Sequence, residues 1–146
     1  MNPRERVYIA LGSNLGDREA ILARAREALA KLPLTTLLAA SAIEETAAVG
    51  GPAGQGPYLN QMVVADTTLD PGRFLKLLHK IEDENGRVRA ERWGPRTLDL
   101  DIVRFGTRRL RDPDLKIPHP ELPNRDWWQR EIEELDRLAP QKRDED

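Results

Sequence analysis

The order of apolar and polar residues along the chain predicts where strands and helices begin and end. The apolar run Val7 to Leu11 predicts a buried strand, and the turn formers in 12–17 predict a break after it. A helix follows, because six apolar residues then recur at helical spacing until Pro33 ends the pattern. These residues are Ile21, Leu22, Ala25, Ala28, Leu29 and Leu32. The apolar stretch Leu34 to Glu45 predicts a second strand.

The middle of the chain predicts a loop, a strand and a second helix. Residues 50–57 are mostly glycine and proline and predict an irregular loop, after which Tyr58 to Thr68 predicts a strand. Asp70 followed by Pro71 is typical of the first turn of a helix. The expected end of this helix is Asn85-Gly86, because glycine readily adopts the left-handed conformation that closes many helices. Its buried face comprises Phe74, Leu75, Leu78 and Ile81.

The last third of the chain predicts one more strand and one more helix. Thr97 to Phe105 is the clearest strand in the sequence. A turn at Gly106 and a polar connection then lead to the proline-bracketed segment 117–120. Beyond Asn124, apolar residues at helical spacing predict a helix that Pro140 stops. These residues are Trp128, Ile132, Leu135 and Leu138.

The resulting order of elements, βαββαβ with one added helix, predicts the fold class. It is the order of an α+β, ferredoxin-like core, in which helices pack on a mainly antiparallel sheet. The chain has 146 residues, a length that suits one compact domain. We therefore expect a single domain over residues 1–140 and a frayed tail over 141–146.

Composition narrows the class of protein further. The 23 Lys and Arg residues against 25 Asp and Glu residues argue against a generally basic nucleic-acid binder. Because the chain has no cysteine, disulfides, thiolate metal sites and cysteine nucleophiles are excluded. No apolar run approaches the length of a signal-peptide core or a membrane span. We expect a cytoplasmic protein that does not bind a membrane.

Two aspartates in the clearest strand are candidate metal ligands. Side chains alternate along a strand, so Asp99 and Asp101 face one way while the leucines and isoleucine between and beside them face the other. Two adjacent carboxylates repel each other unless a cation lies between them, and magnesium takes oxygen ligands. For an isolated Asp-x-Asp, an ordinary solvated polar face is the more frequent explanation.

Four arginines precede these aspartates and favour a polyphosphate ligand. They are Arg87, Arg89, Arg92 and Arg96. Arginine binds phosphate oxygens with two parallel hydrogen bonds, so arginines beside a magnesium site suit a polyphosphate substrate. Surface ion pairs with the neighbouring carboxylates are the alternative. No glycine-rich phosphate loop is present, so ATP would be held in another way. Of the two histidines, His79 is interpreted as structural, and His119 either as structural or as a phosphate ligand.

Several motifs together resemble the 6-hydroxymethyl-7,8-dihydropterin pyrophosphokinases of folate biosynthesis, from about Tyr8 to Arg125. The most specific is Gly86-Arg87-Val88-Arg89 followed by the segment 92–102, RWGPRTLDLDI. The supporting motifs are Ala10-Leu11-Gly12-Ser13-Asn14-Leu15-Gly16-Asp17, Glu45-Thr46, Val49-Gly50, Tyr58-Leu59-Asn60, Ile81-Glu82 and Ile117-Pro118-His119-Pro120.

The resemblance implies a reaction and an ATP site. The enzyme would transfer the pyrophosphoryl group of ATP to the hydroxymethyl group of the pterin, giving the pterin diphosphate and AMP. Asp99 and Asp101 would bind two magnesium ions that bridge the ATP phosphates and the attacking hydroxyl. The catalytic set would be Arg87, Arg96, Asp99 and Asp101. The ATP site would comprise Glu82, Arg89, Arg92, Trp93, Ile102, His119 and Arg125.

The resemblance also implies a pterin site, formed by Thr46, Val49, Tyr58, Asn60, Asp99 and Trp127. The flat heterocycle would lie between aromatic rings, with Asn60 on its polar edge. Trp127 aligns with the pterin-stacking aromatic, but Trp128 is adjacent and a helix could present either ring. The charged segment 126–137 departs from the apolar, proline-containing segment usual in the family.

Two alternatives belong to other classes of protein. A ferredoxin-like RNA-binding module would carry aromatic rings on its central strands, whereas the rings here fall at strand edges, in loops or in the last helix. A metal-dependent nuclease could also use an Asp-x-Asp pair. We expect small-molecule substrates only, no nucleic acid and, because one chain can hold both substrates, a monomer.

Overall fold

The computed structural model of the protein describes residues 2–47, 55–85 and 97–140. Its larger sheet has five strands, and a separate hairpin has two. Among the described residues, the strands are β1 (Glu5–Ser13), β2 (Thr35–Ala40), β3 (Glu44–Thr46), β4 (Tyr58–Thr67), β5 (Asp99–Phe105), β6 (Leu110–Asp112) and β7 (Leu115–Ile117). The helices are α1 (Arg18–Ala30), α2 (Pro71–Glu84), the short 3-10 helix η1 (Leu122–Asn124) and α3 (Asp126–Leu138).

The order of strands in the sheet confirms the predicted ferredoxin-like arrangement. The order is β2-β4-β1-β5 with every neighbouring pair antiparallel, and β3 also pairs with β4. Strands β1 and β2, connected by α1, are therefore parallel and separated by β4. Strands β4 and β5, connected by α2, are likewise separated by β1. Two interleaved split βαβ units thus form one sheet.

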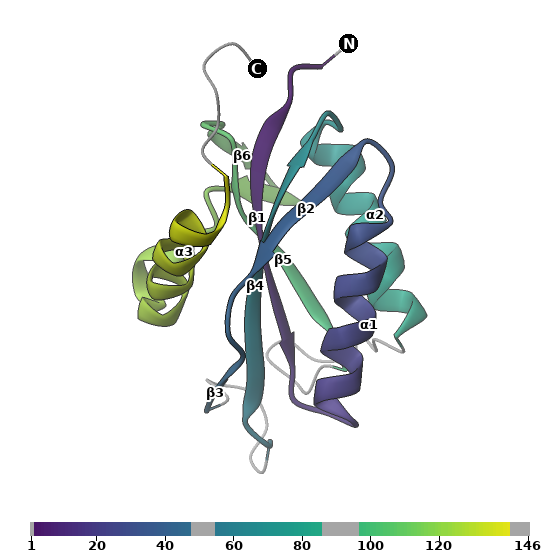
Figure 1. Ribbon diagram of the computed structural model, residues 1–146, viewed down its shortest axis with the longest axis vertical. Helices are drawn as coiled ribbons and strands as arrows, with labels where there is room; N and C mark the ends of the chain where they lie inside the picture. Colours follow the sequence, from purple (N-terminus) through teal and green to yellow (C-terminus); the bar gives the residue numbers. More distant parts are fainter. Residues whose placement is uncertain (1, 48–54, 86–96, 141–146) are drawn as a thin grey trace.

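The helices cover both faces of the sheet (Figure 1). The core on one side combines residues of α1 and α2 with alternate residues of the strands, such as Ile9 and Leu100. The core on the other side combines α3 with strand residues of the opposite parity, such as Ala10 and Met62. The sheet is therefore the middle of three layers, with α1 and α2 on one face and the C-terminal helix α3 on the other.

The segment predicted as one strand from Leu34 to Glu45 is two strands, β2 and β3. The interruption lies at Ser41, whose Oγ accepts a hydrogen bond of 2.9 Å from the backbone N–H of Met62 in β4. The Ser41 backbone N–H donates in turn to the Met62 carbonyl, also at 2.9 Å. Because a side chain takes the place of one backbone acceptor, the regular pairing is broken there and resumes at Glu44.

A bulge in β5 sends its last residues to different sides of the sheet. Ile9 of β1 pairs with Ile102 and Tyr8 pairs with Arg104, so Val103 is an extra residue in the ladder. Val103 packs in the core under α3, whereas Phe105 packs in the core under α1 and α2. Phe105 meets Phe74 of α2 edge to face, with ring centroids 5.8 Å apart.

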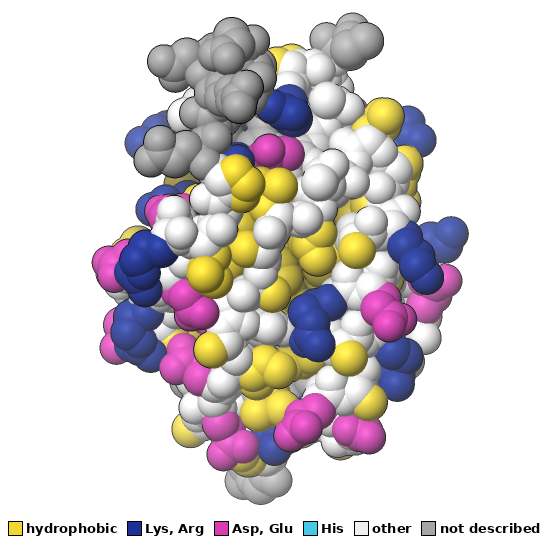
Figure 2. Space-filling model, in the orientation of Figure 1, with side chains coloured by type: hydrophobic (Ala, Val, Ile, Leu, Met, Phe, Trp, Pro, Cys, Tyr) yellow, Lys and Arg dark blue, Asp and Glu magenta, His cyan; other side chains and the backbone are white. Residues whose placement is uncertain are grey.

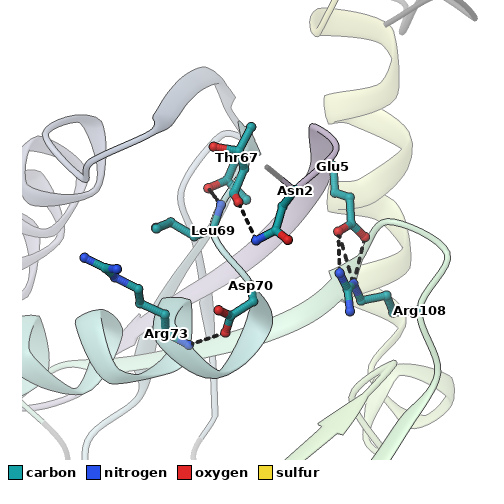
Figure 3. Close-up of polar contacts among 8 residues, drawn as sticks. Asn2, Glu5, Thr67, Leu69, Asp70, Arg73 and Arg108 are labelled. Carbon is teal, nitrogen blue, oxygen red and sulfur yellow. Dashed lines mark hydrogen bonds and ion pairs between the residues drawn. The ribbon is translucent and has the colours of Figure 1, made fainter.

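Capping residues set the starts of the first two helices, as the sequence predicted. Asp17 accepts a hydrogen bond from the backbone N–H of Ala20 at the start of α1. Asp70 accepts one from Arg73 at the start of α2, at 2.9 Å (Figure 3). The end of α2 is described as far as Asn85, whose side chain donates to the Ile81 carbonyl; Gly86 lies outside the described residues.

The polar connection after β5 forms the β6–β7 hairpin, which the sequence pattern did not predict. Its first turn is held to β1 by Arg108, which donates from Nε and Nη2 to the carboxylate of Glu5 at 2.8 to 3.1 Å (Figure 3). Gly106 lies in the same turn with φ +55°, and a Cβ there would lie 2.6 Å from the Glu5 carboxylate. The turn therefore needs a glycine. The ion pair between Arg108 and Glu5 holds the turn before the hairpin against the start of β1.

Contacts to β1 hold the C-terminal end of α3. The Tyr8 hydroxyl donates to Asp136, and burial together with that carboxylate raises the pKa of Tyr8 to about 12. Arg6 donates to the Pro140 carbonyl at 2.7 Å. Leu138 does not share the buried face predicted for it, because its side chain is 57% exposed.

The surface of the described residues is mixed in character. Figure 2 shows hydrophobic side chains along the middle of one face, over β2 and β4, with charged side chains on either side. Within the described ranges, none of the helices combines the length and apolar character that crossing a membrane requires.

Candidate active site

Two rows of residues cross the sheet on the face that α3 covers. Asp99 of β5, Gly12 of β1 and Asn60 of β4 pair directly across the three strands. Asp101, Ala10 and Met62 form the next row. Paired residues in antiparallel strands direct their side chains to the same face, and Ala10 and Met62 both pack under α3. The two aspartates and Asn60 therefore share this face, as the alternation in the sequence predicted for the aspartates.

The residue between Asp99 and Asn60 in the first row is a glycine, which contributes no side chain of its own. A Cβ at Gly12 would lie 3.4 Å from the ring of Tyr58 and 3.8 Å from Oδ1 of Asn60. Strands are about 4.8 Å apart, so Asp99 and Asn60 stand roughly 10 Å from each other across this glycine. The β1 residue between the aspartate and the candidate pterin residues thus contributes only backbone.

Glu82 supports the strand that carries both aspartates. It is fully buried on α2, and its Oε2 accepts a hydrogen bond of 2.8 Å from the backbone N–H of Leu100. Because β5 is at the edge of the sheet, no strand of the described residues pairs with that N–H on its outer side. The buried carboxylate therefore takes the place of a neighbouring strand between Asp99 and Asp101.

His119 lies against Asp101, with Nε2 3.6 Å from Oδ1. The other ring nitrogen, Nδ1, accepts a hydrogen bond of 3.0 Å from the backbone N–H of Glu121. An imidazole whose Nδ1 accepts carries its proton on Nε2, so the N–H of the neutral ring points toward the aspartate. The backbone N–H of His119 donates to the Val103 carbonyl at 2.9 Å and ties this segment to β5.

The start of α3 brings an arginine and two tryptophans to the same place. The guanidinium carbon of Arg125 lies 4.5 Å from the ring centroid of Trp128 and 5.8 Å from that of Trp127. Trp128 is 2% exposed and packs in the core under α3, whereas Trp127 is half-buried. The indole N–H of Trp127 is buried without a hydrogen-bond partner in the described structure. Of the two rings, Trp127 is therefore the one with an unsatisfied donor.

The two tryptophans face different parts of the sheet. Adjacent helical residues are about 100° apart around the axis, while residues three and four apart are neighbours. Trp127 is three residues before Arg130, which pairs with Glu44 of β3 at 3.2 Å. Trp128 instead meets His119 edge to face, at 5.0 Å between centroids. Trp128 therefore lies next to His119 at the β5 edge, and Trp127 lies about 100° further around the helix axis.

Three of the candidate pterin residues lie together where β3 pairs with β4. Thr46 is directly opposite Tyr58, and Asn60 donates from Nδ2 to Oγ1 of Thr46 at 2.6 Å. This bond leaves Oδ1 of Asn60 as an acceptor and orients the amide. The fourth candidate on this side, Val49, lies outside the described residues.

Residues at the start of α1 hold the same end of the β3–β4 hairpin. Arg18 pairs with the carboxylate of Glu45 at 3.2 Å and donates to the Pro57 carbonyl at 2.8 Å. Asn14 donates to the Gly56 carbonyl and to the side chain of Gln55, both at 3.2 Å. The residues on both sides of the hairpin loop are therefore fastened to α1 and to the end of β1.

A pocket of about 310 Å³ lies beside the aspartates, between the outer edge of β5, α2 and the β6–β7 hairpin. Both site aspartates and His119 line it on the sheet side. His79, which the sequence suggested as structural, lines it from α2. The remaining lining residues are Leu75, Leu100, Ile102, Pro113, Asp114, Leu115, Lys116 and Pro120.

Five of the expected phosphate-binding and loop residues lie outside the described residues: Arg87, Arg89, Arg92, Trp93 and Arg96. The described part of the site therefore consists of the aspartates, Glu82, Ile102, His119, Arg125 and the pterin-side residues. Among described residues, no three acidic or imidazole side chains gather as metal ligands would. Two carboxylates on one face still suit magnesium, because it usually takes one or two carboxylates and completes its shell with water and phosphate.

Sequence reasoning missed the residues that support this site. The sequence pattern gave no sign of the contacts made by Gly12, Asn14 and Arg18, because their partners are distant in the chain. Gly12 and Asn14 do fall within the motif at residues 10–17. The pocket side of the β6–β7 hairpin was missed because its strands have only three residues each.

Comparison with known proteins adds an independent finding. The family model described as 7,8-dihydro-6-hydroxymethylpterin-pyrophosphokinase matches residues 8–137. Three bacterial proteins named 2-amino-4-hydroxy-6-hydroxymethyldihydropteridine pyrophosphokinase are similar to this chain. That of Pseudomonas aeruginosa is 47% identical over 79% of this chain and 70% of its own length. That of Bacillus subtilis is 44% identical over 79% and 68%, and that of Pseudomonas putida is 45% identical over 78% and 93%.

Proposed function

The chain belongs to the 7,8-dihydro-6-hydroxymethylpterin-pyrophosphokinase family, and we propose that Asp99 and Asp101 are the centre of its active site. As a member, it transfers the pyrophosphoryl group of ATP to 6-hydroxymethyl-7,8-dihydropterin in folate biosynthesis. One observation carries the assignment of the site. The two carboxylates lie on one face of β5, between a pocket on one side and the row that ends at Asn60 on the other.

Magnesium is the metal that this donor set suits, and Asp99 and Asp101 are the residues that would hold it, with two ions expected. When bound, magnesium would supply positive charge to the phosphate oxygens and to the attacking oxygen. Glu82 contributes indirectly, because its hydrogen bond to Leu100 holds the strand segment between the two ligands.

The nucleotide would occupy the pocket between α2, β5 and the β6–β7 hairpin. His119 points its Nε2–H toward Asp101 and could donate to a phosphate oxygen. Arg125 has no carboxylate partner among the described residues, so its N–H groups remain available for phosphate. Ile102 lines the pocket at the edge of β5. Arg87, Arg89, Arg92, Trp93 and Arg96 complete this proposed set from outside the described residues.

The pterin would lie across Gly12, with its hydroxymethyl group toward Asp99. Asn60 and Thr46 supply hydrogen-bonding groups at its polar edge, and Tyr58 supplies an aromatic ring. Trp127 is the better candidate for the second ring, because Trp128 is packed in the core. The buried indole N–H of Trp127, which has no hydrogen-bond partner in the described structure, is a further reason. Val49 remains a proposed member of this set.

In the reaction, the pterin hydroxyl oxygen forms a bond to the β-phosphorus of ATP. The bond from that phosphorus to the oxygen of the α-phosphate breaks, AMP leaves with that oxygen, and the hydroxyl proton passes to solvent. The protein forms no covalent bond, so its residues act by holding the two substrates in line and by stabilising negative charge. Lys116 and His119 on the pocket side and hydrogen-bonding groups on the pterin side suit this division.

We also propose that the protein acts as a single domain and a monomer in the cytoplasm. Two cores share one sheet, which supports a single domain over residues 1–140. Both proposed substrate sites lie within one chain, so no second copy is needed. ATP and reduced pterins are small cytoplasmic metabolites, so we expect no nucleic acid or membrane as a partner.

The test is AMP formation from ATP and magnesium, with and without 6-hydroxymethyl-7,8-dihydropterin. We expect AMP only with the pterin, and we expect its loss both with a chelator and in the Asp99→Asn, Asp101→Asn double variant. Glu27→Gln is the control, because Glu27 is exposed on α1, none of whose residues lines the pocket. AMP release that ignores the pterin, or hydrolysis of nucleic acid, would point to another acceptor. Full activity in the double variant would place the metal elsewhere.

A further inference from the structure

Trp128 contacts two residues of the proposed ATP site and is itself buried. The guanidinium carbon of Arg125 lies over its ring at 4.5 Å from the centroid. On another side, the ring of His119 meets it edge to face, at 90° and 5.0 Å between centroids. His119 in turn approaches Asp101 at 3.6 Å. A continuous series of contacts therefore runs from Arg125 through Trp128 and His119 to the aspartates.

The contact with Trp128 completes the restraints on the His119 ring. The hydrogen bond from Glu121 restrains Nδ1, and the backbone bond to Val103 restrains the main chain. The indole adds a further restraint, because edge-to-face aromatic pairs have a preferred geometry and resist rotation of either ring. Without it, the Nε2–H would point toward Asp101 for a smaller fraction of the time.

The contact with Arg125 holds a cation without using its hydrogen-bond donors. An arginine that stacks on an aromatic ring presents its flat face to the ring, and its N–H groups point outward in the plane of the guanidinium. Across the described part of the chain, Arg125 forms no ion pair. A carboxylate partner would have competed with phosphate for these donors, whereas an indole does not.

We propose that Trp128 is a positioning residue for ATP, which holds His119 and Arg125 in place for the phosphates without touching the substrate. This inference rests on the proposed function of the site. It also gives the adjacent tryptophans separate proposed roles, since Trp128 contacts the ATP-site residues and Trp127 is the candidate for the pterin-stacking ring. The family resemblance assigned no role to Trp128 beyond the open choice of stacking ring.

The first test compares Trp128→Met with Trp128→Phe. Methionine fills the core without an aromatic face, and phenylalanine keeps one. For Trp128→Met we expect a rise of about tenfold in the KM for ATP, which corresponds to about 1.4 kcal/mol. The KM for the pterin should stay within about twofold of wild type. Trp128→Phe should recover most of the loss, because it restores both the edge-to-face and the cation–π contact.

Leu135→Ala separates positioning from simple loss of packing. Leu135 is fully buried in the same core but is not in contact with His119 or Arg125 in any described interaction. If Leu135→Ala, with a similar loss of Tm, raises the KM for ATP as much as Trp128→Met does, the positioning role is overturned. An unchanged KM for ATP in Trp128→Met overturns it as well.

A second measurement covers the case in which Trp128→Met does not fold. Trp128→Leu, which also lacks an aromatic face, is then combined with Arg125→Gln, and the ATP affinity of each variant is measured with a non-hydrolysable analogue. Non-additive effects support the contact, and additive effects reject it. Failure of the proposed function is distinguishable, because wild type itself would then show no pterin-dependent AMP. Failure of this inference leaves that activity intact and removes only the ATP-specific effect.

Discussion

The carboxylate of Glu82 accepts a hydrogen bond of 2.8 Å from the backbone N–H of Leu100, the residue between Asp99 and Asp101. A residue of α2 thereby determines how the edge strand presents its two acidic side chains. Glu82 is fully buried, so the bond is made out of contact with water. The proposed metal ligands and the helix behind them are coupled through this contact.

Replacing Glu82 should therefore affect both stability and metal use. Glu82→Leu leaves the Leu100 N–H without its acceptor, which costs about 1 to 3 kcal/mol for a buried group. Glu82→Gln keeps an acceptor oxygen and should lose less stability. Urea unfolding measures the first effect, and the magnesium concentration at half-maximal AMP formation measures the second. Equal stability of Glu82→Leu and wild type would show that the bond does not support β5.

Thr46→Val should weaken binding of the pterin while sparing ATP. The substitution keeps the shape of the side chain and removes the oxygen to which Asn60 donates at 2.6 Å. The Asn60 amide is then free to turn away from the pterin edge. We expect a KM for the pterin about fivefold higher, equivalent to about 1 kcal/mol, the size of one net hydrogen bond. Thr36→Val on the exposed side of β2 is the matched control.

Arg18→Ala should also act on the pterin side, through the two ends of the hairpin loop. Arg18 binds Glu45 before the loop and the Pro57 carbonyl after it. Without these bonds, the positions of Thr46 and Tyr58 are less restrained. We expect a several-fold rise in the KM for the pterin, an unchanged KM for ATP and a change in Tm of only a few degrees, since both side chains are partly exposed. Arg24→Ala, on the exposed side of α1, should change neither the KM for the pterin nor the KM for ATP.

Glu131 should make the stability of the protein depend on pH. Its side chain is 3% exposed on α3, and neither carboxylate oxygen has a hydrogen-bond partner among the described residues. Burial, with the nearby carboxylates of Glu44 and Glu134, raises the pKa of Glu131 to about 8; Arg130 and the nearby Ser41 side chain oppose this in part. The folded state therefore binds the proton more tightly than the unfolded state does, whose pKa is near 4.5.

The contribution of Glu131 to stability is therefore fully present below about pH 4.5 and is lost as the pH rises toward 8. A single proton changes the free energy of unfolding by up to about 1.4 kcal/mol per pH unit in that range. Glu131→Gln, which resembles the protonated acid, should flatten this dependence and raise the Tm at pH 8.5 relative to wild type. Glu133→Gln, on the exposed side of α3, should change neither the pH dependence of stability nor the Tm at pH 8.5. Parallel pH profiles of Tm for Glu131→Gln and wild type would contradict the prediction.

Short-range patterns determined most of the fold. The apolar stripes of α1 and α2 and their aspartate caps depend on residues within a few positions of each other. The same holds for the alternation that puts Asp99 and Asp101 on one face, because side-chain direction along a strand is a local property. The motifs added the family, which the comparisons confirmed. The roles of the individual site residues stay predictions.

The tertiary structure decided what depends on contacts between distant parts of the chain. Ser41 divides a segment predicted as one strand, because its side chain bonds to Met62 on a neighbouring strand. Trp127 and Trp128 look alike in the sequence, and only the packing of α3 on the sheet buries one ring and leaves the other with a free donor. Glu82 bonds to Leu100 because α2 packs against the edge strand β5. Local propensity sets the helices and strands of this protein. The strand register and the packing of helices on the sheet decide which side chains meet at the site, because these depend on the free energy of the whole fold.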